Sequence, residues 1–182
     1  MKAGYVLGLF AATVLYQVGM PAAMIVSRER VLRDGEVIRI RTAPVDPYDA
    51  FRGRYVWLGM NTWTLPLAEG AGKARTGRWV YMTFTNDVEG FSAPAAVQVQ
   101  PPAEGTYLRV RARFAPGGMV YARPPFDRYY LEEHRAPAAE AAYRDANART
   151  NRDAHVVVRV LDGRGVLEDL VIAGKSVQEI GR

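Results

Sequence analysis

The densest group of side chains that could perform chemistry is Glu132, Glu133 and His134, with His155 further along the chain. Carboxylates and imidazoles can bind a metal ion or exchange protons in general acid–base catalysis. Adjacent residues of a strand point to opposite faces, however, and this spacing matches no established zinc pattern. We therefore interpret the group as an exposed helix start, and we predict neither a metal nor another cofactor.

Nucleophilic and phosphate-binding patterns are also missing from the sequence. The serines are Ser27, Ser92 and Ser176, and none of them lies in a GxSxG motif. The chain has no cysteine, and neither GxGxxG nor GxxxxGK[ST] occurs. Catalytic residues are therefore unknown, because an enzyme here would have to build its site from scattered Asp, Glu, Arg and Tyr.

An apolar stretch from Gly4 to Val26 predicts a membrane anchor. A bilayer core of about 30 Å needs roughly 20 helical residues, whereas the core of a signal peptide typically has about 7 to 15. We expect residues 1–27 to form an uncleaved, single-pass transmembrane helix in the lipid bilayer and residues 28–182 to form one soluble domain. The alternatives are a signal cleaved near Ala22 and Ala23 or a buried core helix.

The basic residues do not form a concentrated run. The net charge of +5 is moderate for 182 residues, and we predict no nucleic-acid partner. Arg109, Arg111 and Arg113 alternate along one expected strand, and we interpret them as a solvated outer face. The arginines from Arg28 to Arg33 could attract anionic lipid at about 1 kcal/mol each.

The chain beyond the anchor alternates mostly with a period of two, which indicates β-strands. Strands are expected at residues 37–41, 54–60, 78–85, 95–100, 107–114, 119–123, 155–161 and 166–173. Glycine and proline, which interrupt regular structure, predict a loop at 63–76. Pro137 opens an expected helix at 137–149. Asp162-Gly163 predicts a hairpin before a polar tail. We predict a mainly β (α+β) fold, an antiparallel barrel-like or sandwich domain of about seven to nine strands with one helix.

Residues 44–60, PVDPYDAFRGRYVWLGM, combine signals for a helix start and a strand. Asp46 before Pro47 favours the first turn of a helix, and Gly53 suits the end of so short a turn. Residues 55–58 are then enriched in strand formers. The stretch predicts a helical turn leading into a strand, with a structural role.

This stretch resembles the signature of the GDYXXLXY family of bacterial membrane-anchored proteins. The matching positions are Pro44, Asp46, Pro47, Phe51, Arg52, Gly53, Tyr55 and Leu58. Arg54 stands where the family name has Asp, and Met60 stands where it has the final Tyr, so no role of that Asp carries over. Residues 126–134 resemble the family's second conserved block. The resemblance implies an exported protein that works together with multi-spanning membrane proteins. It implies no established activity.

Two sequence signals for the orientation of the expected transmembrane helix disagree. Lys2 is the basic residue before the apolar stretch, whereas several arginines follow it. A count of positive residues on the two sides therefore predicts that the domain stays in the cytoplasm. A short basic tip is also typical of a signal anchor that exports its domain. Because the resembled family is exported, we expect a single-pass protein of the bacterial inner membrane with an extracytoplasmic domain.

Aromatic residues gather in the two blocks that carry the resemblance. If the blocks meet in space, they could line a groove for a peptide or glycan. The candidate groove residues are Tyr48, Trp57, Phe126, Arg128, Tyr129 and Tyr130. Packing in the core is the competing interpretation for these side chains.

The sequence favours a membrane-anchored interaction or assembly module that works with other membrane proteins. The alternative is a membrane-tethered hydrolase or carbohydrate-active enzyme, and any small-molecule ligand is unknown. An enzyme would present a concave pocket with at least two titratable groups of perturbed pKa, whereas an interaction module would present an apolar or aromatic patch.

Overall fold

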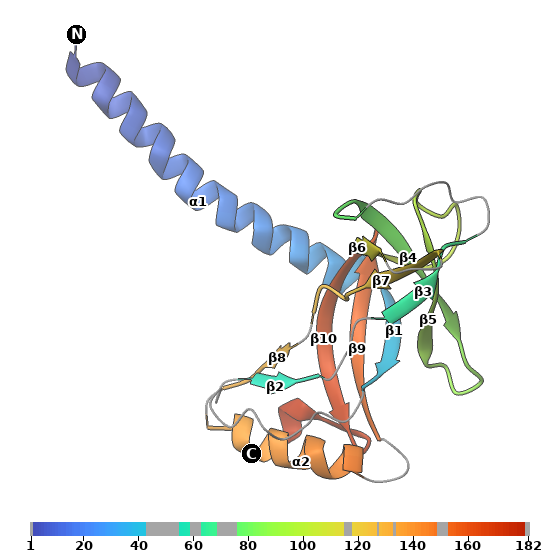
Figure 1. Cartoon of the computed structure of the whole chain (residues 1–182). Coiled ribbons are helices and arrows are strands. Elements are labelled where there is room, and N and C mark those ends of the chain that lie inside the picture. Colours follow the sequence, from blue (N-terminus) through green and yellow to red (C-terminus); the bar gives the residue numbers. More distant parts are fainter. Residues whose placement is uncertain are drawn as a thin grey trace.

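A computed structural model describes residues 2–42, 55–58, 63–68, 76–114, 118–126, 128–132, 134–148 and 153–180. The chain begins with α1 (Lys2–Asp34), a helix of 33 residues that continues through Pro21. At about 1.5 Å per residue its length is about 50 Å, which exceeds a bilayer core. Its apolar side chains from Tyr5 to Val26 are exposed, and Figure 1 shows the helix projecting from the β-rich domain. Helix α1 is therefore long and apolar enough to cross a membrane.

A four-stranded antiparallel sheet begins directly after α1. Its order is β1 (Glu36–Arg41), β9 (Ala154–Leu161), β10 (Arg164–Ile172) and β11 (Lys175–Ser176). Alternate residues of β9, such as Val156 and Val158, are fully buried, whereas the residues between them are half-buried. This alternation is the period of two that the sequence shows.

Five further strands curl into a nearly closed barrel. Their order is β3 (Trp63–Pro66), β7 (Met119–Ala122), β6 (Tyr107–Phe114), β4 (Trp79–Asn86) and β5 (Ser92–Gln98). A parallel bridge between Leu67 and Val97 joins the two outer strands, and the Ala68 N–H donates to the Val97 carbonyl at 2.9 Å. The barrel core contains the fully buried side chains of Val80, Met82 and Leu108.

A small layer of mixed structure lies at the other side of the four-stranded sheet. Strands β2 (Tyr55–Trp57) and β8 (Arg128–Tyr130) pair antiparallel, and α2 (Ala136–Ala148) lies below them in Figure 1. The Tyr143 hydroxyl of α2 donates to the Leu58 carbonyl at 2.9 Å, in a buried position. The chain ends in a short 3-10 helix, η2 (Val177–Glu179), whose Val177 is fully buried.

These elements confirm the predicted fold class, with an apolar N-terminal helix, antiparallel barrel-like β structure and a helix close to residues 137–149. The structure corrects several details, beginning with the expected loop at 63–76, which contains β3. Residues 128–130, where no element was expected, form β8, and the polar tail includes β11 and η2. The part of the chain that is described has eleven strands, more than predicted, because short strands such as β3 and β11 have no clear alternation to reveal them.

The arginine-bearing face of β6 packs on an aromatic ring. The guanidiniums of Arg109 and Arg111 lie 4.4 and 4.8 Å from the centroid of the Trp79 ring. Both arginines and Trp79 are exposed. This face is therefore an outer surface on which cation–π contacts hold the side chains.

Candidate functional site

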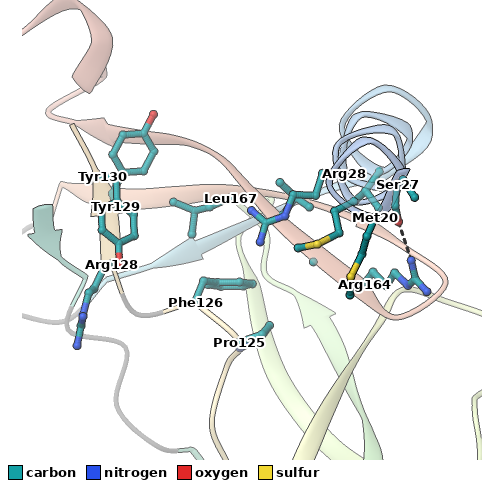
Figure 2. A pocket seen from close by; sticks show the side chains of 15 residues that line it. Met20, Ser27, Arg28, Pro125, Phe126, Arg128, Tyr129, Tyr130, Arg164 and Leu167 are labelled. Carbon is teal, nitrogen blue, oxygen red and sulfur yellow. Dashed lines mark hydrogen bonds between the residues drawn. The ribbon is translucent and has the colours of Figure 1, made fainter. Parts of the chain in front are cut away.

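A pocket of about 850 Å³ lies between α1 and the β domain. Its volume is within the range of about 300 to 1,000 Å³ that is common for ligand sites. Three segments that are distant in the sequence form its walls: the second half of α1, the segment that contains β8, and the start of β10 (Figure 2). The pocket therefore exists only where the helix meets the domain.

The first wall is one stripe of α1. Its residues are spaced three or four apart, so they share one helix face. They are Met20, Ala23, Met24, Ser27, Arg28 and Val31. The stripe is apolar towards the N-terminal side and becomes polar at Ser27 and Arg28, where the apolar stretch of the helix ends.

The second wall belongs to the second sequence block. Its lining residues are Pro125, Phe126, Arg128, Tyr129 and Tyr130. Tyr130 is 70% exposed, whereas Tyr129 is buried and its hydroxyl accepts a hydrogen bond from Gln178 Nε2 at 2.9 Å. Burial raises the pKa of Tyr129, and this effect exceeds the opposing effect of that hydrogen bond. Tyr129 therefore stays a neutral phenol at physiological pH.

The third wall is the beginning of β10, immediately after the β9–β10 turn. It contributes Arg164, Gly165, Val166 and Leu167. A side chain at Gly165 would meet Leu108 Cδ2 at 2.7 Å and Phe126 Cε1 at 3.0 Å. The glycine therefore lets Phe126 and the barrel approach β10 closely beneath the pocket.

The last turns of α1 are fixed to the domain, so the pocket walls keep fixed positions relative to one another. Val31 is only 3% exposed, and Arg164 Nη1 donates to Ser27 Oγ at 2.7 Å. At Gly35 an added Cβ would overlap the Val31 carbonyl and would lie 3.1 Å from the backbone N and O of Val160. This close approach leaves no flexible linker between α1 and β1.

The charged side chains among the described lining residues are arginines. Arg28 extends from α1 towards Leu167, Arg164 lies beside Ser27, and Arg128 directs its guanidinium away from the helix at the opposite end (Figure 2). Carboxylates and imidazoles, the usual proton carriers in catalysis, are not among the residues described in this lining. The arrangement favours binding of an anionic group beside an apolar surface.

The structure places the family motif partly in the core. Leu58 is fully buried, and Tyr55, Val56 and Trp57 pair through their backbones with Tyr130, Tyr129 and Arg128. The two sequence blocks therefore meet in space, as the groove hypothesis requires. Motif residues Pro44, Asp46, Pro47, Phe51, Arg52 and Gly53 lie outside the described residues, as does Tyr48.

The groove hypothesis named four residues that line this pocket: Phe126, Arg128, Tyr129 and Tyr130. Their opposite walls are α1 and β10, which the sequence interpretation did not include. The stripe of α1 was missed because apolar residues surround this helix on every side, which hides any one face. A spacing of three and four residues occurs on every face of such a helix, so the sequence carried no signal for this one.

The acidic and imidazole residues do not converge in the described structure. His134 lies 3.4 Å from Glu132 on the surface, whereas the ring of His155 packs against Phe91 with centroids 5.1 Å apart. No group of three acidic or histidine side chains that could hold a metal ion occurs among the residues described. Glu133 lies outside them.

The three serines each have a structural hydrogen-bond partner. Besides the Arg164–Ser27 contact, the Ser92 hydroxyl donates to Asn86 Oδ1 at 2.7 Å, and the Ser176 hydroxyl donates to Asp169 Oδ1 at 3.0 Å. Ser176 also accepts from the Gln178 N–H and caps η2. These contacts give each serine a role in joining or ending elements.

Comparisons with known proteins identify a family and nothing narrower. Neither the curated proteins nor the solved structures contain a significant match to this chain. A family model described as GDYXXLXY protein matches residues 17–170, which include the second half of α1, both sequence blocks and nearly all of β10. Because the match covers most of the chain, the protein belongs to the GDYXXLXY family.

Proposed function

We propose that this chain is a membrane-anchored interaction module that works with other membrane proteins. The observation that carries the proposal is the rigid junction between α1 and the β domain. Val31 and Gly35 pack the helix end against β9 and β10, so the orientation of the helix also sets the orientation of the domain. A module that must meet partners in the same bilayer gains from such a fixed orientation, because less conformational entropy is lost on assembly.

The proposal includes a location. We place α1 across the bacterial inner membrane as a single-pass anchor with the domain on the extracytoplasmic side. The chain has no cysteine, so a single Val88→Cys substitution at a fully exposed position provides a unique label site. We expect a membrane-impermeant maleimide to label it in cells whose outer membrane is permeabilised. Labelling only after the inner membrane is broken would place the domain in the cytoplasm.

Copurification tests the interaction directly. The tagged full-length protein is extracted in mild detergent and the copurifying proteins are identified by mass spectrometry. A flexible Gly-Ser linker inserted between Asp34 and Gly35 preserves the anchor and the sheet but removes their fixed relation. We expect this insertion to lose a stoichiometric membrane partner.

A matched insertion separates orientation from general damage. The same linker between Ala103 and Glu104 lies in an exposed turn far along the chain from α1. We expect this control to keep the partner. A partner retained by both variants would contradict the role of the junction, and a stable wild-type protein without any partner would favour the enzymatic alternative.

A further inference from the structure

We propose that the pocket beneath α1 binds an anionic phospholipid of the surrounding bilayer. In this arrangement Arg28 and Arg164 hold the phosphate, and the apolar residues beside them hold the start of an acyl chain. The inference assigns a ligand to the pocket; it rests on the proposed membrane location of α1 and not on a protein partner.

Charge complementarity is the first argument. Arg28 and Arg164 come from different elements and both line the pocket, and in Figure 2 Arg28 extends towards Leu167 whereas Arg164 lies beside Ser27. Among the described residues Arg28 has no acidic partner, and Arg164 uses one of its five N–H donors on Ser27. Guanidiniums bind phosphate oxygens with strong, charge-assisted hydrogen bonds, so these two side chains suit a lipid phosphate.

Position relative to the membrane is the second argument. The exposed apolar face of α1 ends at Val26, and Arg28 follows within one turn. With the helix across a bilayer, Arg28 therefore lies at the level of the lipid headgroups. A lipid beside α1 reaches the pocket without leaving the bilayer.

Apolar side chains line the pocket beside the arginines. Met20 and Met24 belong to the α1 stripe, and both are more than half exposed in the protein. Leu167 and Phe126 line the pocket from the domain, across from Met20 in Figure 2. Flexible methionine side chains adapt to irregular ligands, so this surface can accommodate an acyl chain.

Native mass spectrometry of the full-length protein in detergent tests the proposal. The probes are phosphatidylglycerol and phosphatidylcholine with identical acyl chains, each added at the same concentration. We expect several-fold greater retention of phosphatidylglycerol, and we expect Arg28→Gln to reduce it about tenfold, as loss of one charge-assisted contact would. Arg30→Gln removes the same charge two residues further along α1, outside the pocket lining, and should leave retention unchanged.

Two further variants keep the test valid if an arginine variant is unstable. Met24→Trp fills the apolar part of the pocket from an exposed position, and we expect it to lower retention of phosphatidylglycerol several-fold. Leu15→Trp adds the same bulk at an exposed position outside the lining and should have no effect. Equal retention of the two lipids, or equal losses in Arg28→Gln and Arg30→Gln, would overturn a specific pocket.

Photocrosslinking identifies the occupant in native membranes. A photoreactive phenylalanine analogue replaces Tyr130 at the pocket and, as a control, the remote and fully exposed Val88. We expect a lipid adduct from position 130 alone. A crosslink to another protein or to a second copy of this chain at position 130 would show a protein occupant and would contradict the lipid proposal.

Discussion

Leu58 shows how a family motif can be structural. Its side chain is fully buried, and its carbonyl accepts the hydrogen bond of Tyr143 from α2. One residue therefore joins the end of β2 both to the core and to the helix. Its motif partner Tyr55 pairs through the backbone with Tyr130 beside the pocket, so the motif positions a wall of the site without contributing an evident reactive group.

Truncation of Leu58 should be costly. We expect Leu58→Ala to lower the free energy of unfolding by about 2 to 5 kcal/mol, because it removes buried methyl groups and leaves a cavity. Thermal and denaturant unfolding would measure the loss. Val88→Ala, at a fully exposed position, is the control and should change stability little. A similar small change for both variants would contradict the role of Leu58 in the core.

His155 should make stability depend on pH. Burial lowers the pKa of His155 most, and nearby Arg39 and Arg41 lower it further. The unfolded chain, with an ordinary value near 6.5, therefore binds a proton where the folded protein does not. Stability contributed by neutral His155 is present above pH 6.5 and declines as the pH falls below it.

Unfolding measured from pH 8 to pH 5 tests this expectation. His155→Gln should reduce the decline below pH 6.5, although loss of the Phe91 contact lowers stability at every pH. The slope is thus the informative quantity. An unchanged slope in His155→Gln would assign the pH dependence to other groups.

At the scale of elements, the β9–β10 hairpin connects the four-stranded sheet, the barrel and the pocket. Its turn residues Asp162 and Gly163 both have positive φ, 50° and 76°, as a type I′ turn requires. The Gly163 carbonyl accepts from the Arg109 N–H of β6 at 2.8 Å. The turn therefore holds the barrel against the sheet and places Arg164 at the pocket.

Substitutions of Gly163 and Gly174 separate the cost of a left-handed backbone in a turn from the cost of steric crowding. Gly163→Ala would place Cβ 2.8 Å from Tyr107 Cε2 and 3.2 Å from Arg109 Cβ. Gly174 also has a positive φ, 79°, but nothing lies within 4 Å of its added Cβ. We expect Gly174→Ala to cost about 1 to 2 kcal/mol from the left-handed conformation, and Gly163→Ala to cost more. Equal losses in thermal unfolding would mean that the contact with β6 yields easily.

At the scale of the whole molecule, the last turns of α1 belong to the packing of the domain. Val31 is nearly inaccessible, and Arg159 Nη1 donates to the Gly35 carbonyl at 3.3 Å. The expected boundary at residue 27 separates the apolar stretch from the domain by composition, whereas the helix itself continues to Asp34. The apolar stretch and the domain thus share one continuous helix.

Two truncations test how much of α1 the domain needs. A chain that begins at Ser27 keeps Val31 and the Arg164 contact, whereas a chain that begins at Gly35 loses both. We expect the shorter chain to be less stable by about 1.5 to 3 kcal/mol, the usual value of one buried aliphatic side chain. Equal midpoints of thermal unfolding would show that α1 is only an anchor.

The sequence by itself determined the elements whose signal is local. Apolar length predicted α1, alternation predicted strands such as β6 and β9, and Asp162-Gly163 predicted the β9–β10 hairpin. Each of these signals lies within neighbouring residues, so it can be read from the sequence without knowledge of tertiary contacts. The sequence also grouped Phe126, Arg128, Tyr129 and Tyr130 among the candidate groove residues, with core packing as the competing interpretation, and these four line the pocket.

The tertiary structure alone decided what those residues face. Strands β3 and β8 are too short for a local pattern, and the distant strands β7 and β2 stabilise them through backbone pairing. The walls of α1 and β10 come from opposite ends of the chain, and no local signal records which face of a uniformly apolar helix the domain covers. Packing of Val31 and Gly35 fixes that face, because only one orientation lets the helix backbone approach β9 so closely.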